Sequence, residues 1–294
     1  MHTYFLYGLG FSSDIRLFNI PETEVSTIDV SIHKGAISYD GVLESQRNFF
    51  YDQHFAVLTC TFGELRINDG REIIYSLKEG ASSESISPFI VGWGIAFLLT
   101  QRGHSVFHCS ALSRNDKCFL VSGASGAGKS TTALNLIKKG CLYLTDDLAI
   151  VNSFEDMMVP PAYPIQKVCR DVSLTLENDK LYSIHNDRGK YSYLNTDDFC
   201  DKPQKLQVIF KLLLSDSDKV TTTEVTGIMK YMKTIESLFF AETYSHFGLP
   251  DDDKYRCLKI AGNIRVFAIT RPRGMNTLDE ITDTIIRIMD SLED

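Results

Sequence analysis

Residues 105–151 read SVFHCSALSRNDKCFLVSGASGAGKSTTALNLIKKGCLYLTDDLAIV, and this stretch decides the fold. Its middle, residues 123–130, matches the pattern G-x-x-x-x-G-K-S/T in full. An apolar run (118–122) leads into the pattern, and a helix-forming run (129–139) leads out of it and stops at a glycine. A strand, a glycine-rich loop and a helix in this order indicate an α/β protein with a phosphate-binding loop.

Each part of this loop has a physical task. The glycines allow positive φ, so that several N–H groups can point at phosphate oxygens. Lys129 would reach the β- and γ-phosphates, and the Ser130 hydroxyl would bind Mg²⁺. ATP is the default nucleotide over GTP, because contacts to the base lie outside the motif. The expected nucleotide contacts are Gly123, Ala124, Ser125, Gly126, Ala127, Gly128, Lys129, Ser130 and Thr131.

The apolar run before the loop has a neighbour, residues 106–112, separated from it by a short polar turn. Two strands joined this closely must be antiparallel, because a parallel crossover needs a dozen or more residues. His108 lies in this neighbouring run and could approach the γ-phosphate end. A histidine in an apolar strand is also often a core residue.

Asp146 and Asp147 follow a short apolar run (141–145) just after the loop helix. If that run is a strand beside the phosphate strand, both carboxylates lie at the edge that faces the phosphates. One could bind Mg²⁺ together with Ser130, and the other could take a proton from an attacking hydroxyl. Two solvated turn residues are the ordinary alternative.

The run FHCSAL, a short turn, FLVSGASGAGKSTTALNLIKKG and then LTDD resemble the catalytic domain of HPr kinase/phosphorylase. They are more similar still to short HPr-kinase-like proteins, some of which are peptide-tailoring kinases of lasso-peptide gene clusters. The strong resemblance covers residues 104–152. It implies a mixed sheet of the phosphoenolpyruvate-carboxykinase type, with an antiparallel neighbour for the phosphate strand.

The resemblance also implies roles for site residues. His108 matches the active-site histidine of the family, residues 123–130 its phosphate loop, and Asp146 and Asp147 its acidic pair. Asp147 is then the general base toward a serine hydroxyl and Asp146 the metal ligand, although the two could be exchanged. The glycine-rich signature of the bifunctional enzymes is not found after the pair, so recognition of HPr and phosphorolysis are not implied.

Length and composition limit the number of domains, the kinds of partner and the cellular compartment. The chain has 294 residues, which suggests about two domains, and we expect a β-rich accessory domain at 1–103 with a bridging helix and the kinase-like domain at 104–294. With 30 basic and 38 acidic residues, a net charge of −8 argues against nucleic-acid binding. Seven scattered cysteines favour a reduced, cytoplasmic protein. The apolar run 86–100 is too short to span a membrane, so no membrane role is expected.

Several secondary elements and further candidates are predicted. Strands are expected at 3–7, 26–30, 55–62, 72–76, 208–214 and 264–270, and helices at 87–101, 225–240 and 278–292. Lys190 in DRGKY could be a second phosphate contact, part of a mobile lid over the substrate, or a solvated turn residue. Arg271 could clamp a phosphate or carboxylate, or lie in an exposed turn with Arg273. Asp251, Asp252 and Asp253 suggest a solvated loop, and Trp93 a core residue.

The combined prediction is a kinase that transfers the γ-phosphate of ATP, with Mg²⁺, to a hydroxyl of a peptide or protein, and the resemblance implies that this hydroxyl belongs to a serine. Three alternatives stay open: a nucleotide-dependent switch or assembly ATPase without an acceptor, a small-molecule kinase, and a dual kinase/phosphorylase. The accessory domain could bind a leader peptide, a partner or a second copy of the chain in a homo-oligomer.

Overall fold

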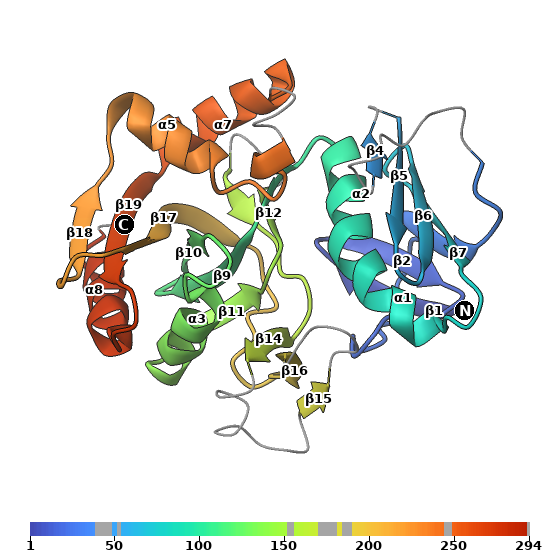
Figure 1. Cartoon of the computed structure of the whole chain (residues 1–294), viewed down its shortest axis with the longest axis horizontal. Coiled ribbons are helices and arrows are strands. Elements are labelled where there is room, and N and C mark those ends of the chain that lie inside the picture. Colours follow the sequence, from blue (N-terminus) through green and yellow to red (C-terminus); the bar gives the residue numbers. More distant parts are fainter. Residues whose placement is uncertain are drawn as a thin grey trace. The chain divides into compact units, whose positions relative to one another are not determined.

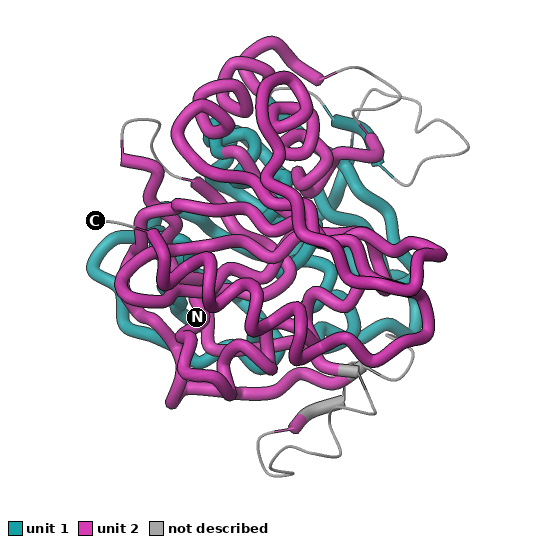
Figure 2. The backbone as a smooth tube through the Cα atoms, turned by 90° about the vertical axis from the view of Figure 1, so that its left-hand side faces the viewer, with its two compact units in different colours: residues 1–104, 182–189 teal, residues 105–181, 190–294 magenta. Residues whose placement is uncertain are grey.

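The computed structural model describes residues 1–38, 49–51, 54–151, 156–169, 181–183, 190–243 and 249–292. The chain forms two compact units, residues 1–104 with 182–189, and residues 105–181 with 190–294 (Figure 2). Both units combine helices with mixed sheets, so the molecule belongs to the α/β class.

The first unit is built on a seven-stranded sheet in the order β1-β2-β3-β7-β6-β5-β4. The β2–β3 and β3–β7 pairs are parallel and the other neighbours are antiparallel. The strands are β1 His2–Leu6, β2 Leu9–Ser13, β3 Val30–Lys34, β4 Phe49–Tyr51, β5 Phe55–Cys60, β6 Gly63–Asn68 and β7 Glu72–Leu77. The strand expected at 26–30 is wrong, since β3 starts only at Val30. Asp29 instead binds the backbone of Gly10, its carboxylate accepting from Gly10 N at 2.8 Å.

One helical segment of this unit has three parts: α1 Ser83–Phe89, the π-turn η1 Ile90–Gly94 and α2 Ile95–Gln101. The expected helix start at 87 is wrong, because Ser82 caps the helix by accepting from Ser85 N. Ser87 is buried, and its hydroxyl accepts from Phe18 N at 2.7 Å. Pro88 therefore lies inside the helix, where its missing N–H accounts for a break in the α-helical pattern.

This segment, Ser83–Gln101, passes a length-and-hydropathy test for a membrane span, and 56% of its apolar window is buried in the fold. Core helices of soluble proteins pass the same test. Trp93 is 38% exposed, which corrects its placement in the core. Its ring lies 6.4 Å from that of Phe97.

The second unit is organised by the sheet β11-β9-β10-β17-β19-β18. Its centre is parallel, because β10 pairs with β17 and β17 with β19 in parallel, and β9 runs antiparallel to β10 as predicted. These strands are β9 Cys109–Arg114, β10 Lys117–Gly123, β11 Leu142–Thr145, β17 Gln204–Ser215, β18 Thr221–Glu224 and β19 Arg265–Pro272; β13 Met158–Val159 pairs with β17.

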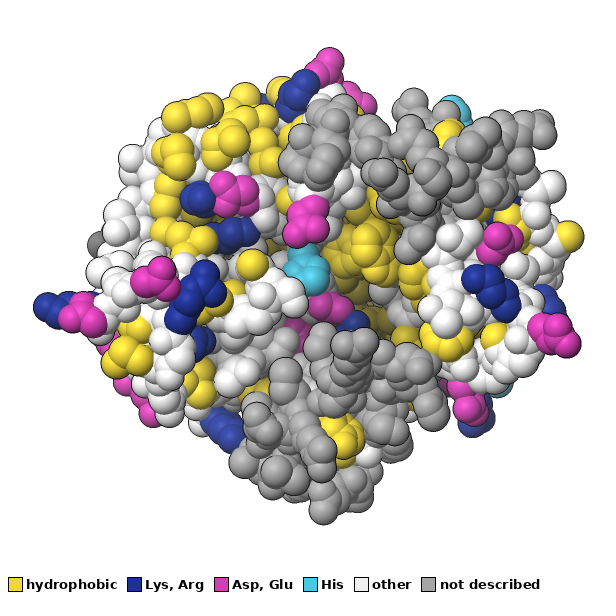
Figure 3. Space-filling model, viewed as in Figure 1, with side chains coloured by type: hydrophobic (Ala, Val, Ile, Leu, Met, Phe, Trp, Pro, Cys, Tyr) yellow, Lys and Arg dark blue, Asp and Glu magenta, His cyan; other side chains and the backbone are white. Residues whose placement is uncertain are grey.

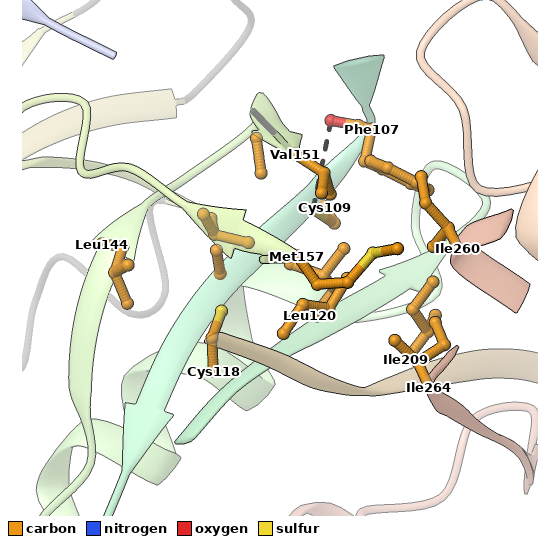
Figure 4. Close-up of a cluster of buried hydrophobic side chains, with 14 of the residues drawn as sticks. Phe107, Cys109, Cys118, Leu120, Leu144, Val151, Met157, Ile209, Ile260 and Ile264 are labelled. Carbon is orange, nitrogen blue, oxygen red and sulfur yellow. Dashed lines mark hydrogen bonds between the residues drawn. The ribbon is translucent and has the colours of Figure 1, made fainter. Parts of the chain in front are cut away.

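Helices cover this sheet on both faces (Figure 1). Alternation along β10 sends Phe119 and Val121 into the cluster with α3 Lys129–Lys138 and α8 Leu278–Asp290. Cys118 and Leu120 join the opposite cluster (Figure 4), against which α5 Gly227–Ile235 and α7 Asp251–Asn263 pack. Six of the cysteines are free thiols, five of them buried.

Two features of the second unit differ from expectation. The run 106–112 is two strands, since β8 Ser105–Phe107 pairs with β12 Ala149–Val151 in a separate ladder and only β9 joins the main sheet. His108 lies at the break between them. The three aspartates 251–253 form the first turn of α7 rather than a loop, and Asp253 is buried and paired with Arg256.

The outer faces of α5 and α7 carry exposed apolar side chains, which form the yellow region at the upper left of Figure 3. They are Ile228, Met229 and Met232 on α5, and Tyr255 and Leu258 on α7.

Candidate functional site

The loop of residues 123–130 connects β10 to α3. Gly126 and Gly128 have φ of +80° and +100°, a backbone conformation that side chains disfavour. Gly123 is required by space instead, because a Cβ there would lie 2.8 Å from the carbonyl oxygen of Leu212 on β17. No side chain caps the start of α3, so its first N–H groups are available to an anion. The loop therefore has the backbone form that a phosphate site needs.

Lys129 begins α3 and folds back over the loop. Its Nζ donates to the carbonyl oxygens of Gly123 at 2.9 Å and Ala124 at 3.4 Å. These bonds keep the ammonium at the first residues of the loop, where it can meet a phosphate.

Arg271 is a second cation at the loop, supplied by the end of β19. Its Nη1 donates to the carbonyl oxygen of Ala127 at 3.4 Å and would lie 2.9 Å from a Cβ at Gly128. Its Nε is buried without a hydrogen-bond partner among the described residues. The sequence left open whether Arg271 and Arg273 both lie in an exposed turn. Only Arg273 does so, and it pairs with Asp216 at 3.4 Å.

Asp146 and Asp147 form a turn between β11 and β12. Thr145 Oγ1 closes the turn by donating to the carbonyl oxygen of Leu148 at 2.7 Å. Asp147 has φ of +75°, in the left-handed region that Asp and Asn tolerate better than most residues. The turn separates the two neighbours, since Asp146 is 5% exposed and the Asp147 side chain is 34% exposed.

Asp146 is held from two sides. Ser110 Oγ on β9 donates to its Oδ1 at 2.6 Å, and Lys167 N on β14 Ile165–Cys169 donates to its Oδ2 at 2.9 Å. Burial, together with the charge of Asp147, raises the pKa of Asp146 against the effect of these bonds. A metal ion at Asp146 has to share oxygens that already accept hydrogen bonds.

Asp147 contacts a cation that the sequence did not point to. Lys167 Nζ lies 2.5 Å from its Oδ2, and His108 Nε2 lies 3.8 Å from its Oδ1. Burial of Lys167 works against its charge, but the charge and hydrogen bond of Asp147, together with Tyr163 and Asp146, outweigh this and the pKa of Lys167 is raised. Lys167 lies on β14, in a separate sheet of order β14-β16-β15 with β16 at Lys190–Leu194 and β15 at Leu181–Ser183. Because this sheet is far from the acidic pair in the sequence, no local pattern could have identified Lys167.

His108 lies between β8 and β9, next to the acidic turn. Its backbone N donates to Ser237 O at 2.9 Å, and its flanking residues Phe107 and Cys109 pack into the core (Figure 4). Burial lowers the pKa of His108; Asp147 opposes this, while Lys129 adds to it. The lowered pKa favours the neutral imidazole, which lies 3.8 Å from Asp147 Oδ1.

Ser110 was not predicted as a site residue, although its alternation with His108 in FHCSAL was a usable signal. Asp187, Arg188 and Gly189 lie outside the described residues, and for Lys190 only the backbone, in β16, is described. The second phosphate contact proposed there stays a prediction.

Magnesium suits the oxygen donors of this site. Ser130 and the two aspartates supply hydroxyl and carboxylate oxygens, which Mg²⁺ prefers, usually together with substrate phosphates. The described part of the chain contains no cluster of three or more His, Cys, Asp or Glu side chains that would bind a metal without such phosphates.

The comparisons with known proteins give limited similarity. No family model matches the chain, and no curated protein matches it. Among solved structures, the Hpr(Ser) kinase/phosphatase from Coxiella burnetii matches with a TM-score of 0.32 and 13% sequence identity, over 63% of this chain and 95% of that one.

Proposed function

We propose that this protein is a phosphotransferase that moves the γ-phosphate of ATP to a hydroxyl group, with a serine of a peptide or protein as the acceptor. One observation carries the proposal: β9 places Cys109 opposite Ser122, the residue before the glycine loop, and the preceding residue, His108, lies 3.8 Å from the partly exposed carboxylate of Asp147. A polyphosphate site beside a strand-end carboxylate is the minimum that phosphoryl transfer to a hydroxyl requires.

Each residue of the site has a separate role in the proposed reaction. The loop amides and Lys129 would bind the phosphates, and Ser130 and Asp146 would hold a Mg²⁺ ion that neutralises charge on the phosphates. Lys167 holds Asp147 Oδ2, so we assign Oδ1 as the atom that accepts the proton of the attacking hydroxyl. The catalytic role of Asp147 and the metal role of Asp146 rest on this proposal.

The test is incubation of the purified protein with γ-labelled ATP, Mg²⁺ and serine-containing peptides encoded beside its gene, read by intact mass. We expect one added phosphate on a serine. Lys129→Ala should abolish nucleotide binding, whereas Lys138→Ala, an exposed lysine at the other end of α3, should leave it unchanged.

Asp147→Asn separates chemistry from binding, because Asn tolerates the left-handed backbone and has the same shape. Loss of a general base should lower the transfer rate by about 10²–10⁴-fold with nucleotide affinity kept. The exposed control Asp218→Asn should behave like the wild type. Near-normal transfer by Asp147→Asn would refute the base assignment, and free phosphate without a labelled acceptor would favour an ATPase switch.

A further inference from the structure

Lys211 is a buried lysine that the proposed mechanism does not use. It lies on β17 directly opposite Ser122, the last residue before the phosphate loop, in the parallel β10–β17 pair. Lys211 is 6% exposed and Ser122 is 1% exposed. The ammonium group is therefore enclosed at the base of the loop rather than in solvent.

The acceptors around this ammonium are all neutral. Lys211 Nζ donates to the carbonyl oxygen of Glu236 at 2.7 Å, to Ser122 Oγ at 3.3 Å and to Ser237 Oγ at 3.4 Å. Within the described residues no carboxylate contacts it. Burying a cation without a charged partner is unfavourable, and a methionine of similar length would fill the position without that cost. The positive charge is thus the property that needs an explanation.

The same contacts connect the loop to the acidic side of the site. Glu236 and Ser237 follow the end of α5, and Ser237 O accepts from the backbone N of His108 at 2.9 Å. Lys211 therefore holds the residue before the loop and the residues that position His108 in one hydrogen-bonded group.

The charges that face Lys211 come from three elements. The pKa of Lys211 is lowered to about 8, and burial is the largest cause. Glu236 and Cys109 of β9 oppose the lowering, while Lys233 of α5 and Lys129 of α3 add to it. Lys211 Nζ donates to Ser122 Oγ and Lys129 Nζ donates to the carbonyl oxygen of Gly123, so the two cations lie beside consecutive residues at the start of the loop and repel each other. An anion bound there would relieve this repulsion.

We propose that Lys211 is a positioning residue of the phosphate site, which stabilises a polyphosphate on the loop by its charge from beneath, without touching the ligand. This rests on the proposed nucleotide binding and names a residue and a linkage that the proposed function does not. Because binding and protonation are reciprocal, a bound polyphosphate raises the proton affinity of Lys211, and the protein takes up protons as it binds Mg–ATP above pH 8.

The experiment is isothermal titration calorimetry with Mg–ATP at pH 7.0 and 8.5, each in two buffers of different ionisation enthalpy. The wild type should take up about half a proton per site at pH 8.5, and much less at pH 7.0, for a shift of about one pKa unit. Lys211→Met should lose this uptake and bind Mg–ATP on the order of tenfold more weakly, while its affinity for adenosine stays unchanged. Lys205→Met, an exposed lysine on the same strand, is the matched control.

Wild-type affinity and proton uptake in Lys211→Met would overturn the proposal while leaving nucleotide binding intact. If that variant does not fold, the wild type decides, since equal proton exchange at the two pH values would also overturn it. A wild type that binds Mg–ATP at neither pH would refute the proposed function itself.

Discussion

Replacing Lys211 with methionine should remove a pH dependence from the stability of the second unit. Burial lowers the pKa of Lys211 from 10.5 to about 8. Between these values the unfolded chain binds more protons than the folded one, so the destabilisation is full below pH 8 and is relieved as the pH rises toward 10.5. For one such group, the free energy of unfolding rises by about 2.5 kcal/mol from pH 7 to pH 10.

Urea denaturation followed by circular dichroism at pH 7, 8.5 and 10 measures this rise. Trp93, the only tryptophan, lies in the first unit, so its fluorescence follows that unit separately. The difference in unfolding free energy between the wild type and Lys211→Met should change by about 2.5 kcal/mol from pH 7 to pH 10. If unfolding free energy falls by about 2.5 kcal/mol per molar urea, this change shifts the difference between the two urea midpoints by about 1 M. Lys205→Met should run parallel to the wild type.

The unpaired groups left by Lys211→Met add an offset that does not depend on pH, so only the slope is diagnostic. Parallel curves for the wild type and Lys211→Met would refute the reasoning, because they would mean that the folded and unfolded states hold the Lys211 proton equally.

Two other predictions concern the loop and the acidic turn. Gly128→Ala forces a side chain into a backbone with φ of +100° and against Arg271, so it should weaken Mg–ATP binding, measured by calorimetry, at least tenfold. Gly140→Ala is the control, because φ there is +89° but no atom lies within 4 Å of the added Cβ. This control should cost about 1 kcal/mol of stability and leave binding unchanged. Lys167→Met removes the partner of Asp147 and should destabilise the protein by about 1–2 kcal/mol, a figure discounted because the pair is about one-third exposed. Because the pKa of Lys167 is raised, this stabilisation is fully present at pH 7 and is lost only above about pH 10.5. Equal unfolding midpoints of the variant and the wild type at pH 7 would contradict this prediction.

Local sequence patterns predicted the elements that depend on neighbouring residues. The loop of residues 123–130 follows β10, and β9 pairs antiparallel with β10, as the short connection through Asn115 and Asp116 requires. Errors arose where a distant contact competed with a local preference. Ser87 was expected to cap a helix, but its hydroxyl binds the backbone of Phe18, and Ser82 takes the cap.

The sequence by itself determined the glycine loop, its lysine and the acidic pair, because contiguous backbone geometry defines each of them. Only the tertiary structure decided which aspartate is buried and which is partly exposed, since Ser110 and Lys167 come from other strands. Arg271 and Lys211 also reach the loop only through the β10–β17–β19 pairing. The loop motif contains no signal for Lys167, Arg271 or Lys211, because these residues reach the site through contacts between strands that are far apart in the chain.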